Sequence, residues 1–232
     1  MEGNIHHADS NGGMLMNNNL RYIIMCGGTY PKWETPRQLT EIHGEPIVAR
    51  TIRLLKENGI KDIAITAQDP RFEQFGVPVL HHENKYIWGK DKIEDHSYWV
   101  DAFYPCDDPA CYLMGDVFFS PFAIRSIVEY TGEDIMFFAS GMCNGKGYTK
   151  PWAEPFAFKV FNQTRFRESI AVTKAYQDRG MFRRKPVSWE LWQVIKNTQL
   201  NTIVLNYHAI DDYTCDVDSP EDAKRLELIK VD

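Results

Sequence analysis

Two glycines and two basic residues follow an apolar stretch near the amino terminus, and together they have the chemistry of a phosphate-binding loop. The stretch begins at Tyr22, and the residues of interest after it are Cys26, Gly27, Gly28, Thr29, Lys32 and Arg37. Glycine allows the backbone to approach a phosphate closely and to turn successive N–H groups toward it, while basic side chains neutralise the phosphate charge. A strand that only contributed to a hydrophobic core would need neither base. This pattern indicates a site for the polyphosphate of a nucleotide.

Aspartates at two distant places in the chain are candidate ligands for a cation. Asp116 follows an apolar run, and burying it there is costly unless it is paired or bound to a cation. Ligands of open α/β sheets gather at the carboxyl ends of strands, so Asp116 is expected to face the same crevice as the glycine loop. Asp216 and Asp218 stand two residues apart, which places both on one face of an extended segment. The alternative for Asp116 is a helix cap, although Ser120 already fills that position. The alternative for Asp216 is a solvated position at a strand end.

Both groups resemble motifs of the small nucleotidyltransferases that make activated sugars, alditols and choline-like head groups. That family has a strand before Ala-Ala-Gly-x-Gly-[ST]-Arg, then a short loop and Pro-Lys-x-Leu. Here Lys32 stands where the arginine is expected, and Arg37 stands where the lysine is expected. The segment 44–63 is also similar to the family, and Asp-Val-Asp-Ser-Pro-Glu-Asp at 216–222 resembles its Asp-x-Asp-[ST]-Pro-Glu-Asp element. The resemblance extends over most of the region 21–228.

The resemblance implies a reaction and a cofactor. A nucleoside monophosphate is transferred from a nucleoside triphosphate, with CTP slightly favoured, to a phosphorylated sugar, alditol or amino alcohol used for a surface polymer, and pyrophosphate leaves. Asp116 and Asp218, with Asp216 as an auxiliary, are implied as ligands of Mg²⁺, which prefers carboxylate and phosphate oxygens. Lys32 and Arg37 are implied to stabilise the charge that spreads over the reacting phosphates.

Further residues are expected beside the two substrates. Asn84 lies in an Asn-x-Tyr sequence that resembles an element bordering the base site in choline-phosphate cytidylyltransferase-like members, although asparagine is also common in turns. Glu154, Arg183 and Arg184 lie in the part of the chain, around 141–200, that resembles the family's acceptor-binding lid. For at least one residue of the basic run 183–185 a solvated turn is the favoured interpretation. The glycine-rich loop from 141 is equally compatible with a surface loop that has no role.

The order of apolar and polar segments predicts an α/β fold. We expect a Rossmann-like three-layer α/β/α sandwich with a central mixed, mostly parallel sheet, which is the GT-A-like nucleotidyltransferase fold. One domain is expected over 20–232, after a mobile polar tail over 1–19. Strands are expected from residue 22 and at 60–66, 77–81, 111–114, 135–139, 155–160 and 202–206. Helices are expected after Pro46 and from Pro121, Gln163, Ser188 and Ser219.

Charge, apolar content and cysteine spacing argue against nucleic-acid, membrane and disulfide-rich classes of protein. A net charge of −6 over 232 residues disfavours nucleic acid and anionic membrane surfaces, which attract basic proteins. No stretch approaches the ~18 apolar residues of a membrane span, so a cytoplasmic location is expected. The five cysteines include no Cys-x-x-Cys pair and are interpreted as reduced thiols. A homo-oligomer is compatible with the sequence.

Two other functions remain compatible with the motifs. Asp216-Val217-Asp218 has the form of the Asp-x-Asp with which GT-A glycosyltransferases hold a metal, although the basic glycine loop is unnecessary for that chemistry. The adjacent glycines, in place of a spaced pair, are compatible with a non-catalytic nucleotide-binding module. Release of pyrophosphate from a triphosphate distinguishes the nucleotidyltransferase from both.

Overall fold

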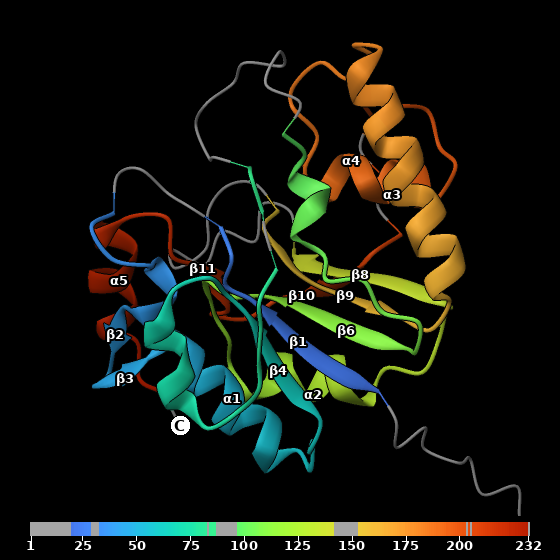
Figure 1. Cartoon of the computed structure of the whole chain (residues 1–232). Coiled ribbons are helices and arrows are strands. Elements are labelled where there is room, and N and C mark those ends of the chain that lie inside the picture. Colours follow the sequence, from blue (N-terminus) through green and yellow to red (C-terminus); the bar gives the residue numbers. More distant parts are fainter. Residues whose placement is uncertain are drawn as a thin grey trace, which may run out of the picture.

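A mixed β-sheet forms the centre of the molecule (Figure 1). The computed structural model describes residues 20–28, 33–82, 84–86, 97–141, 153–202, 204 and 206–231, so the expected tail over 1–19 lies outside it. Within these ranges seven strands form the sheet, in the order β10-β8-β9-β6-β1-β4-β5. They are β1 (Arg21–Met25), β4 (Ile63–Thr66), β5 (Val79–Leu80), β6 (Ala110–Met114), β8 (Ile135–Ser140), β9 (Pro155–Val160) and β10 (His208–Ile210). Only β9 runs antiparallel to its neighbours in this sheet, which is therefore mixed and mostly parallel, as predicted.

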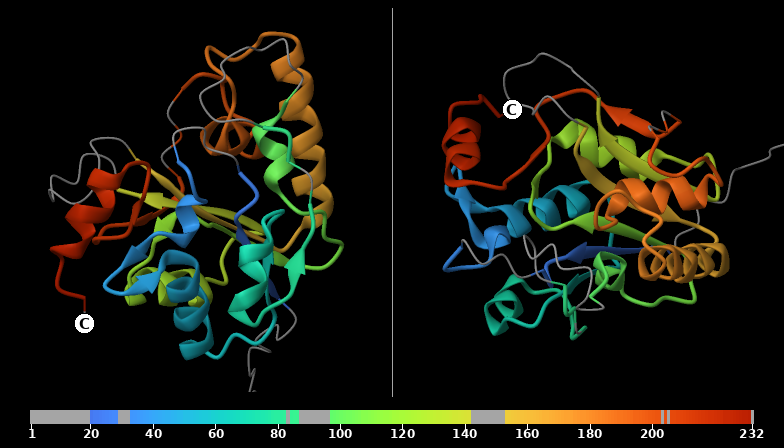
Figure 2. Two further views of the ribbon diagram at one scale, coloured as in Figure 1. Left: turned by 60° about the vertical axis from the view of Figure 1, so that its left-hand side comes forward. Right: turned by 90° about the horizontal axis from the view of Figure 1, so that it is seen from above.

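Helices cover both faces of this sheet. The α-helices of the described ranges are α1 (Ile47–Glu57), α2 (Pro121–Glu129), α3 (Gln163–Asp178), α4 (Ser188–Ile195) and α5 (Pro220–Glu227). Helices α1 and α2 lie on one face, α3 and α4 lie on the other, and α5 lies at the side (Figure 1 and Figure 2). This arrangement confirms the predicted three-layer sandwich. No helix in the described part of the chain has the length and hydropathy that a membrane span requires.

Several short elements complete the fold. Two small antiparallel ribbons pair β2 (Glu41–Ile42) with β3 (Glu45–Pro46), and β7 (Val117–Phe118) with β11 (Cys215–Asp216). Short 3-10 helices are η1 (Arg37–Leu39), η2 (Pro70–Phe75) and η4 (Trp99–Ala102). The β7–β11 ribbon connects two segments that are about a hundred residues apart in the chain.

The central strands are apolar along almost their whole length because the sheet is covered on both faces. Ile23, Ile65 and Leu113 on β1, β4 and β6 are fully buried. A parallel sheet between two helical layers has no solvated face, so its strands lack the alternation of apolar and polar residues. This property made the strand positions readable from short apolar runs.

The predicted helix starts are confirmed at α2 and α5. The hydroxyl oxygen of Ser120 accepts a hydrogen bond from the backbone N–H of Ala123, ahead of a helix that begins with proline. At α5, Ser219 and Asp222 form a capping box, in which each side chain accepts from the backbone N–H of the other residue. Asp222 is thus a capping carboxylate.

The prediction of a strand over 202–206 is wrong. Residues 202, 204 and 206 are outside any strand, residues 203 and 205 lie outside the described ranges, and β10 forms later along the chain. Val204 is nevertheless buried. Its apolar side chain is accommodated by the core without strand pairing, and the ladder with β8 begins only where His208 pairs with Phe138.

Candidate nucleotide and metal site

Neighbouring parallel strands bring the glycine loop and Asp116 together. Met25 at the end of β1 pairs with Met114 at the end of β6, so the residues that follow both strands meet at one edge of the sheet. The backbone N–H of Gly115 donates to the carbonyl of Met25 at 3.1 Å. A Cβ atom at Gly115 would lie 2.4 Å from that carbonyl oxygen and 2.7 Å from the Cys26 Sγ. The close approach therefore requires glycine at position 115.

The β7–β11 ribbon brings the second pair of aspartates to the same place. Asp216 pairs with Val117, the residue after Asp116. The backbone N–H of Val217 donates to the carbonyl of Asp116 at 2.8 Å, which fixes the two segments beside each other. Asp218 then stands immediately before the Ser219 cap of α5. Asp116, Asp216 and Asp218 therefore lie at one site.

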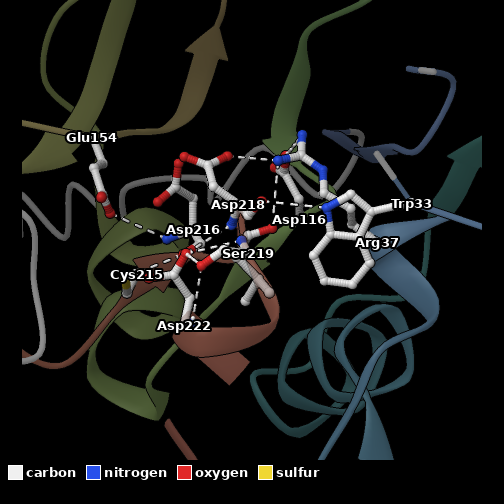
Figure 3. Close-up of polar contacts among 10 residues, drawn as sticks. Trp33, Arg37, Asp116, Glu154, Cys215, Asp216, Asp218, Ser219 and Asp222 are labelled. Carbon is white, nitrogen blue, oxygen red and sulfur yellow. Dashed lines mark hydrogen bonds and ion pairs between the residues drawn. The ribbon is translucent and has the colours of Figure 1, made fainter. Parts of the chain in front are cut away.

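Arg37 bridges two of these carboxylates (Figure 3). Its Nη2 lies 2.5 Å from Asp116 Oδ2 and its Nη1 lies 2.6 Å from Asp218 Oδ1. Arg37 is only 9% exposed. Burial opposes its charge, but attraction by Asp116 and Asp218 outweighs this effect, so the pKa of the guanidinium lies above its ordinary value. The indole N–H of Trp33 also donates to the Asp218 carbonyl at 3.3 Å.

A second cluster of possible ligand atoms lies beside this bridge. Glu154, Cys215 and Asp216 each offer one ligand atom, and these atoms lie within 4.8 Å of one another. Glu154 is 1% exposed, and its Oε2 accepts from the backbone N–H of Asp216 at 3.2 Å (Figure 3). Asp116, Asp216 and Asp218 supply the hard oxygen ligands that suit Mg²⁺, whereas a sulfur ligand, which Cys215 could offer, suits softer metals. The carboxylates present at this site therefore fit a hard divalent cation.

Arg37, Glu154 and the three aspartates line a cleft of about 240 Å³ at the carboxyl ends of the strands. The sequence-predicted site residues that line it are Gly27, Gly28, Arg37, Asn84, Asp116, Glu154, Arg184, Asp216 and Asp218. An adjoining cavity of about 250 Å³ shares Gly27, Gly28 and Arg37 and is also lined by Cys26. Burial raises the pKa of the Cys26 thiol, and the nearby Asp116 carboxylate raises it further.

Arg183 and Arg184 differ in their relation to the cleft, and other predicted residues lie outside the described chain. Arg183 does not line either cavity, and its backbone N–H donates to the Asn201 side chain at 2.7 Å. Arg184 lines the cleft while pairing with Glu190 at 2.8 Å. Thr29 and Lys32 lie outside the described residues, as do residues 142–152 of the expected lid.

Aromatic side chains form part of the cleft that sequence reasoning missed. Tyr86, Trp99 and Trp189 all line it. Trp189 also packs edge-on against Phe137, at 4.8 Å between ring centroids. Tyr86 belongs to the Asn-x-Tyr sequence and could have been included on that basis. Trp99 lies in a 3-10 helix with no local signal that indicates a cleft.

Comparisons with known proteins support the fold. No protein-family model matches the chain, and no curated protein matches it either. Among solved structures it is similar to the inositol-1-phosphate CTP transferase from T. maritima, with 14% identity, a TM-score of 0.58 and coverage of 89% of this chain and 94% of that one. It is also similar to the CTP:phosphocholine cytidylyltransferase from Streptococcus pneumoniae, with 15% identity, a TM-score of 0.52 and coverage of 90% and 97%. The chain therefore has the nucleotidyltransferase fold that its sequence motifs predicted.

Proposed function

We propose that this protein is a magnesium-dependent nucleotidyltransferase that couples a nucleoside monophosphate to a phosphorylated small molecule and releases pyrophosphate. The observation that carries the proposal is the convergence of Gly27-Gly28, Asp116 and Asp218 on one cleft. Backbone amides and a buried cation, here Arg37, bind the phosphates of a triphosphate, and carboxylates bind its metal. The same edge of an α/β sheet is where ligands of such folds bind.

In this mechanism the backbone N–H groups of Gly27 and Gly28 bind the triphosphate, and Arg37 and Lys32 neutralise it. The carboxylates of Asp116 and Asp218, assisted by Asp216, would hold Mg²⁺, which supplies charge stabilisation at the phosphate oxygens. An oxygen of the acceptor phosphate attacks the α-phosphorus, a new P–O bond forms, and the bond to the β-phosphate bridging oxygen breaks. Pyrophosphate carries away the electron pair, and no covalent enzyme intermediate is required.

The donor and acceptor can be proposed more narrowly. CTP, the donor named for two similar solved structures, is the proposed donor, and dTTP is the alternative, since a third similar structure is named as a putative thymidylyltransferase. Asn84 is assigned to the base side of the cleft, and Glu154 and Arg184 to the acceptor side with Trp189. A phosphorylated sugar, alditol or amino alcohol fits a cleft that combines aromatic faces with charged groups. Synthesis of an activated precursor for a cell-surface polymer, in the cytoplasm, is the proposed context.

A first experiment tests binding and turnover separately. The purified protein is mixed with each of ATP, CTP, GTP and UTP, and thermal stabilisation is measured with and without Mg²⁺. Pyrophosphate release is then followed with inositol 1-phosphate, phosphocholine or glucose 1-phosphate as the acceptor. We expect Mg²⁺-dependent stabilisation by one triphosphate and acceptor-dependent pyrophosphate release. Mg²⁺-dependent binding without pyrophosphate release, whichever acceptor is added, would favour the non-catalytic module. A parallel assay with nucleotide sugars in place of triphosphates tests the glycosyltransferase, which would transfer the sugar and release no pyrophosphate.

The Asp116→Asn variant tests the role of the first carboxylate. It removes charge without changing size, so the fold should persist while turnover falls about 10²–10³-fold. Asp62→Asn is the matched control, because Asp62 forms an exposed ion pair with Arg21 away from the cleft. The control should retain full turnover. Unchanged pyrophosphate release from Asp116→Asn would remove Asp116 from the mechanism.

A further inference from the structure

Lys185 is a buried lysine in a run that the sequence presents as a basic turn. It is 8% exposed. Its Nζ donates to the Ser97 hydroxyl oxygen at 2.7 Å and lies 4.7 Å from the centroid of the Tyr86 ring. Removing an ammonium group from water is unfavourable unless such contacts compensate for it. Burial of Lys185 therefore indicates that it holds together segments that are far apart in the chain.

The first of these segments contains the residue assigned to the nucleobase. Asn84 and Tyr86 both line the cleft. The backbone N–H of Tyr86 donates to Asn84 Oδ1 at 2.9 Å. In an asparagine side chain only the amide oxygen can accept a hydrogen bond. The bond from Tyr86 therefore fixes the amide oxygen of Asn84 toward Tyr86 and turns its NH₂ group away from Tyr86. The orientation of the Asn84 amide thus depends on where Tyr86 is held.

The second segment is anchored to the helical layer. Gln177 on α3 donates to the carbonyl of Ser97 at 3.1 Å, so the residue that accepts from Lys185 is itself fixed. On either side of Lys185, the Arg184 side chain and the Val187 backbone N–H both donate to the carboxylate of Glu190 in α4. The loop that carries Lys185 is therefore held to α4 on both sides of this residue. From there the Lys185 side chain reaches Tyr86, in the segment that carries Asn84.

We propose that Lys185 is a positioning residue for nucleobase selection, which acts by holding Tyr86 and, through it, the Asn84 amide at the wall of the cleft. This inference rests on the proposed function and on the placement of the base beside Asn84. A lysine suits the role because one ammonium group can donate to a hydroxyl and also face an aromatic ring. Lys185 does not line the cleft, so its effect on a nucleotide must pass through its neighbours.

The test measures the dissociation constants of ATP, CTP, GTP and UTP with Mg²⁺ by calorimetry, for the wild type and for Lys185→Met, Lys185→Arg and Ser97→Ala. We expect Lys185→Met to bind the preferred nucleotide about tenfold more weakly and to lose most of its preference among the four. Lys185→Arg keeps the charge and the ring contact and should retain the preference. Ser97→Ala should weaken the preference less, and it should add nothing to Lys185→Met in the double variant.

Lys196→Met is the matched control. The Nζ of Lys196 lies 5.1 Å from the centroid of the Trp192 ring and pairs with Glu133, and none of these three residues lines the cleft. This variant should keep the affinity and preference of the wild type. Melting temperatures are recorded for every variant, and Ser97→Ala provides the milder test if Lys185→Met fails to fold.

The outcomes separate this inference from the proposed function. Absence of Mg²⁺-dependent triphosphate binding by the wild type would overturn the proposed function. A selective wild type whose Lys185→Met and Ser97→Ala variants keep the same order and ratio of affinities would overturn the role of Lys185 alone. Lower melting temperature with an unchanged preference would identify Lys185 as a purely structural residue and would also overturn the inference.

Discussion

The Nη2 atom of Arg37 lies 2.5 Å from the Oδ2 atom of Asp116. Through its other terminal nitrogen the same guanidinium pairs with Asp218, so one cation compensates two carboxylates that are distant in sequence. Carboxylates that share a site repel each other unless a positive charge lies between them. The guanidinium therefore neutralises the pair that the proposed function assigns to Mg²⁺. When a nucleotide and its metal bind, Arg37 is free to interact with phosphate only if the metal takes over that compensation.

This relationship predicts that Mg²⁺ can substitute for Arg37 in stabilising the fold. Arg37→Met leaves Asp116 and Asp218 without their shared guanidinium, and the free energy of unfolding should fall by about 1–3 kcal/mol, because both carboxylates are partly exposed and partly screened. Added Mg²⁺ should then raise the melting temperature of the variant more than that of the wild type. Thermal melts in chelator and in a series of Mg²⁺ concentrations measure both effects.

Arg53→Met is the control for this experiment. Arg53 also bridges two carboxylates, those of Glu45 and Glu57, but it does so at the surface. Its replacement should cost at most about 1 kcal/mol and should leave the response to Mg²⁺ unchanged. Equal stabilisation of wild type and Arg37→Met by Mg²⁺ would contradict the idea that guanidinium and metal are alternative partners of Asp116.

Gly115 and Gly28 should respond differently to a methyl group. At Gly115 an added Cβ would meet the Met25 carbonyl oxygen at 2.4 Å, and backbone cannot move aside cheaply. Gly115→Ala should therefore destabilise the protein by about 1–3 kcal/mol. At Gly28 no atom of the described residues lies within 4 Å of an added Cβ, so Gly28→Ala should change stability by less than about 0.5 kcal/mol.

The same pair of variants also tests the phosphate loop. If phosphate approaches the backbone at Gly28, the methyl group of Gly28→Ala should weaken triphosphate binding by about tenfold while the melting temperature stays the same. Urea unfolding and calorimetry give the two measurements. A stable Gly28→Ala variant with wild-type affinity would place the triphosphate elsewhere, and a fully stable Gly115→Ala variant would contradict the close packing of β1 and β6.

Stability should decrease in the alkaline range because of buried thiols. Burial raises the pKa of the Cys111 thiol from 9.0 to about 12. Above pH 9 the unfolded chain releases this proton while the folded protein keeps it, so the free energy of unfolding falls as pH rises from 9 toward 12. One such group contributes a slope of up to about 1.4 kcal/mol per pH unit, and nothing below pH 8.

The Cys111→Ala variant isolates this contribution. Cys26 also has a pKa raised by burial, so the wild-type slope is the sum of several groups and the variant should lose only one proton from it. Urea unfolding at intervals between pH 7 and pH 10.5 measures the slope for both proteins. Parallel curves, displaced only by the cost of the smaller side chain, would show that Cys111 does not titrate differently in the folded protein.

Local chemistry along the chain was sufficient to predict most elements and several of the residues that line the cleft. Short apolar runs marked β1, β6, β8 and β9 because the sheet is buried on both faces. Ser120 and Ser219 marked two helix starts because capping involves only residues within one turn. The glycine loop and the aspartates were recognisable because phosphate and metal binding require particular groups near strand ends. Their roles as ligands remain predictions.

Tertiary structure alone decided which of these groups meet. The sequence contains Arg37 as a phosphate-binding base, but only the packing of η1 against the β7–β11 ribbon makes it the bridge between Asp116 and Asp218. Lys185 lies in a basic run of the kind found in solvated turns. Its side chain is buried because the fold brings Tyr86 and Ser97 into contact with it. These contacts join residues that are tens to hundreds of positions apart. Periodicity and capping act over a few residues, whereas the partners of a buried charge are set by the order of strands in the sheet.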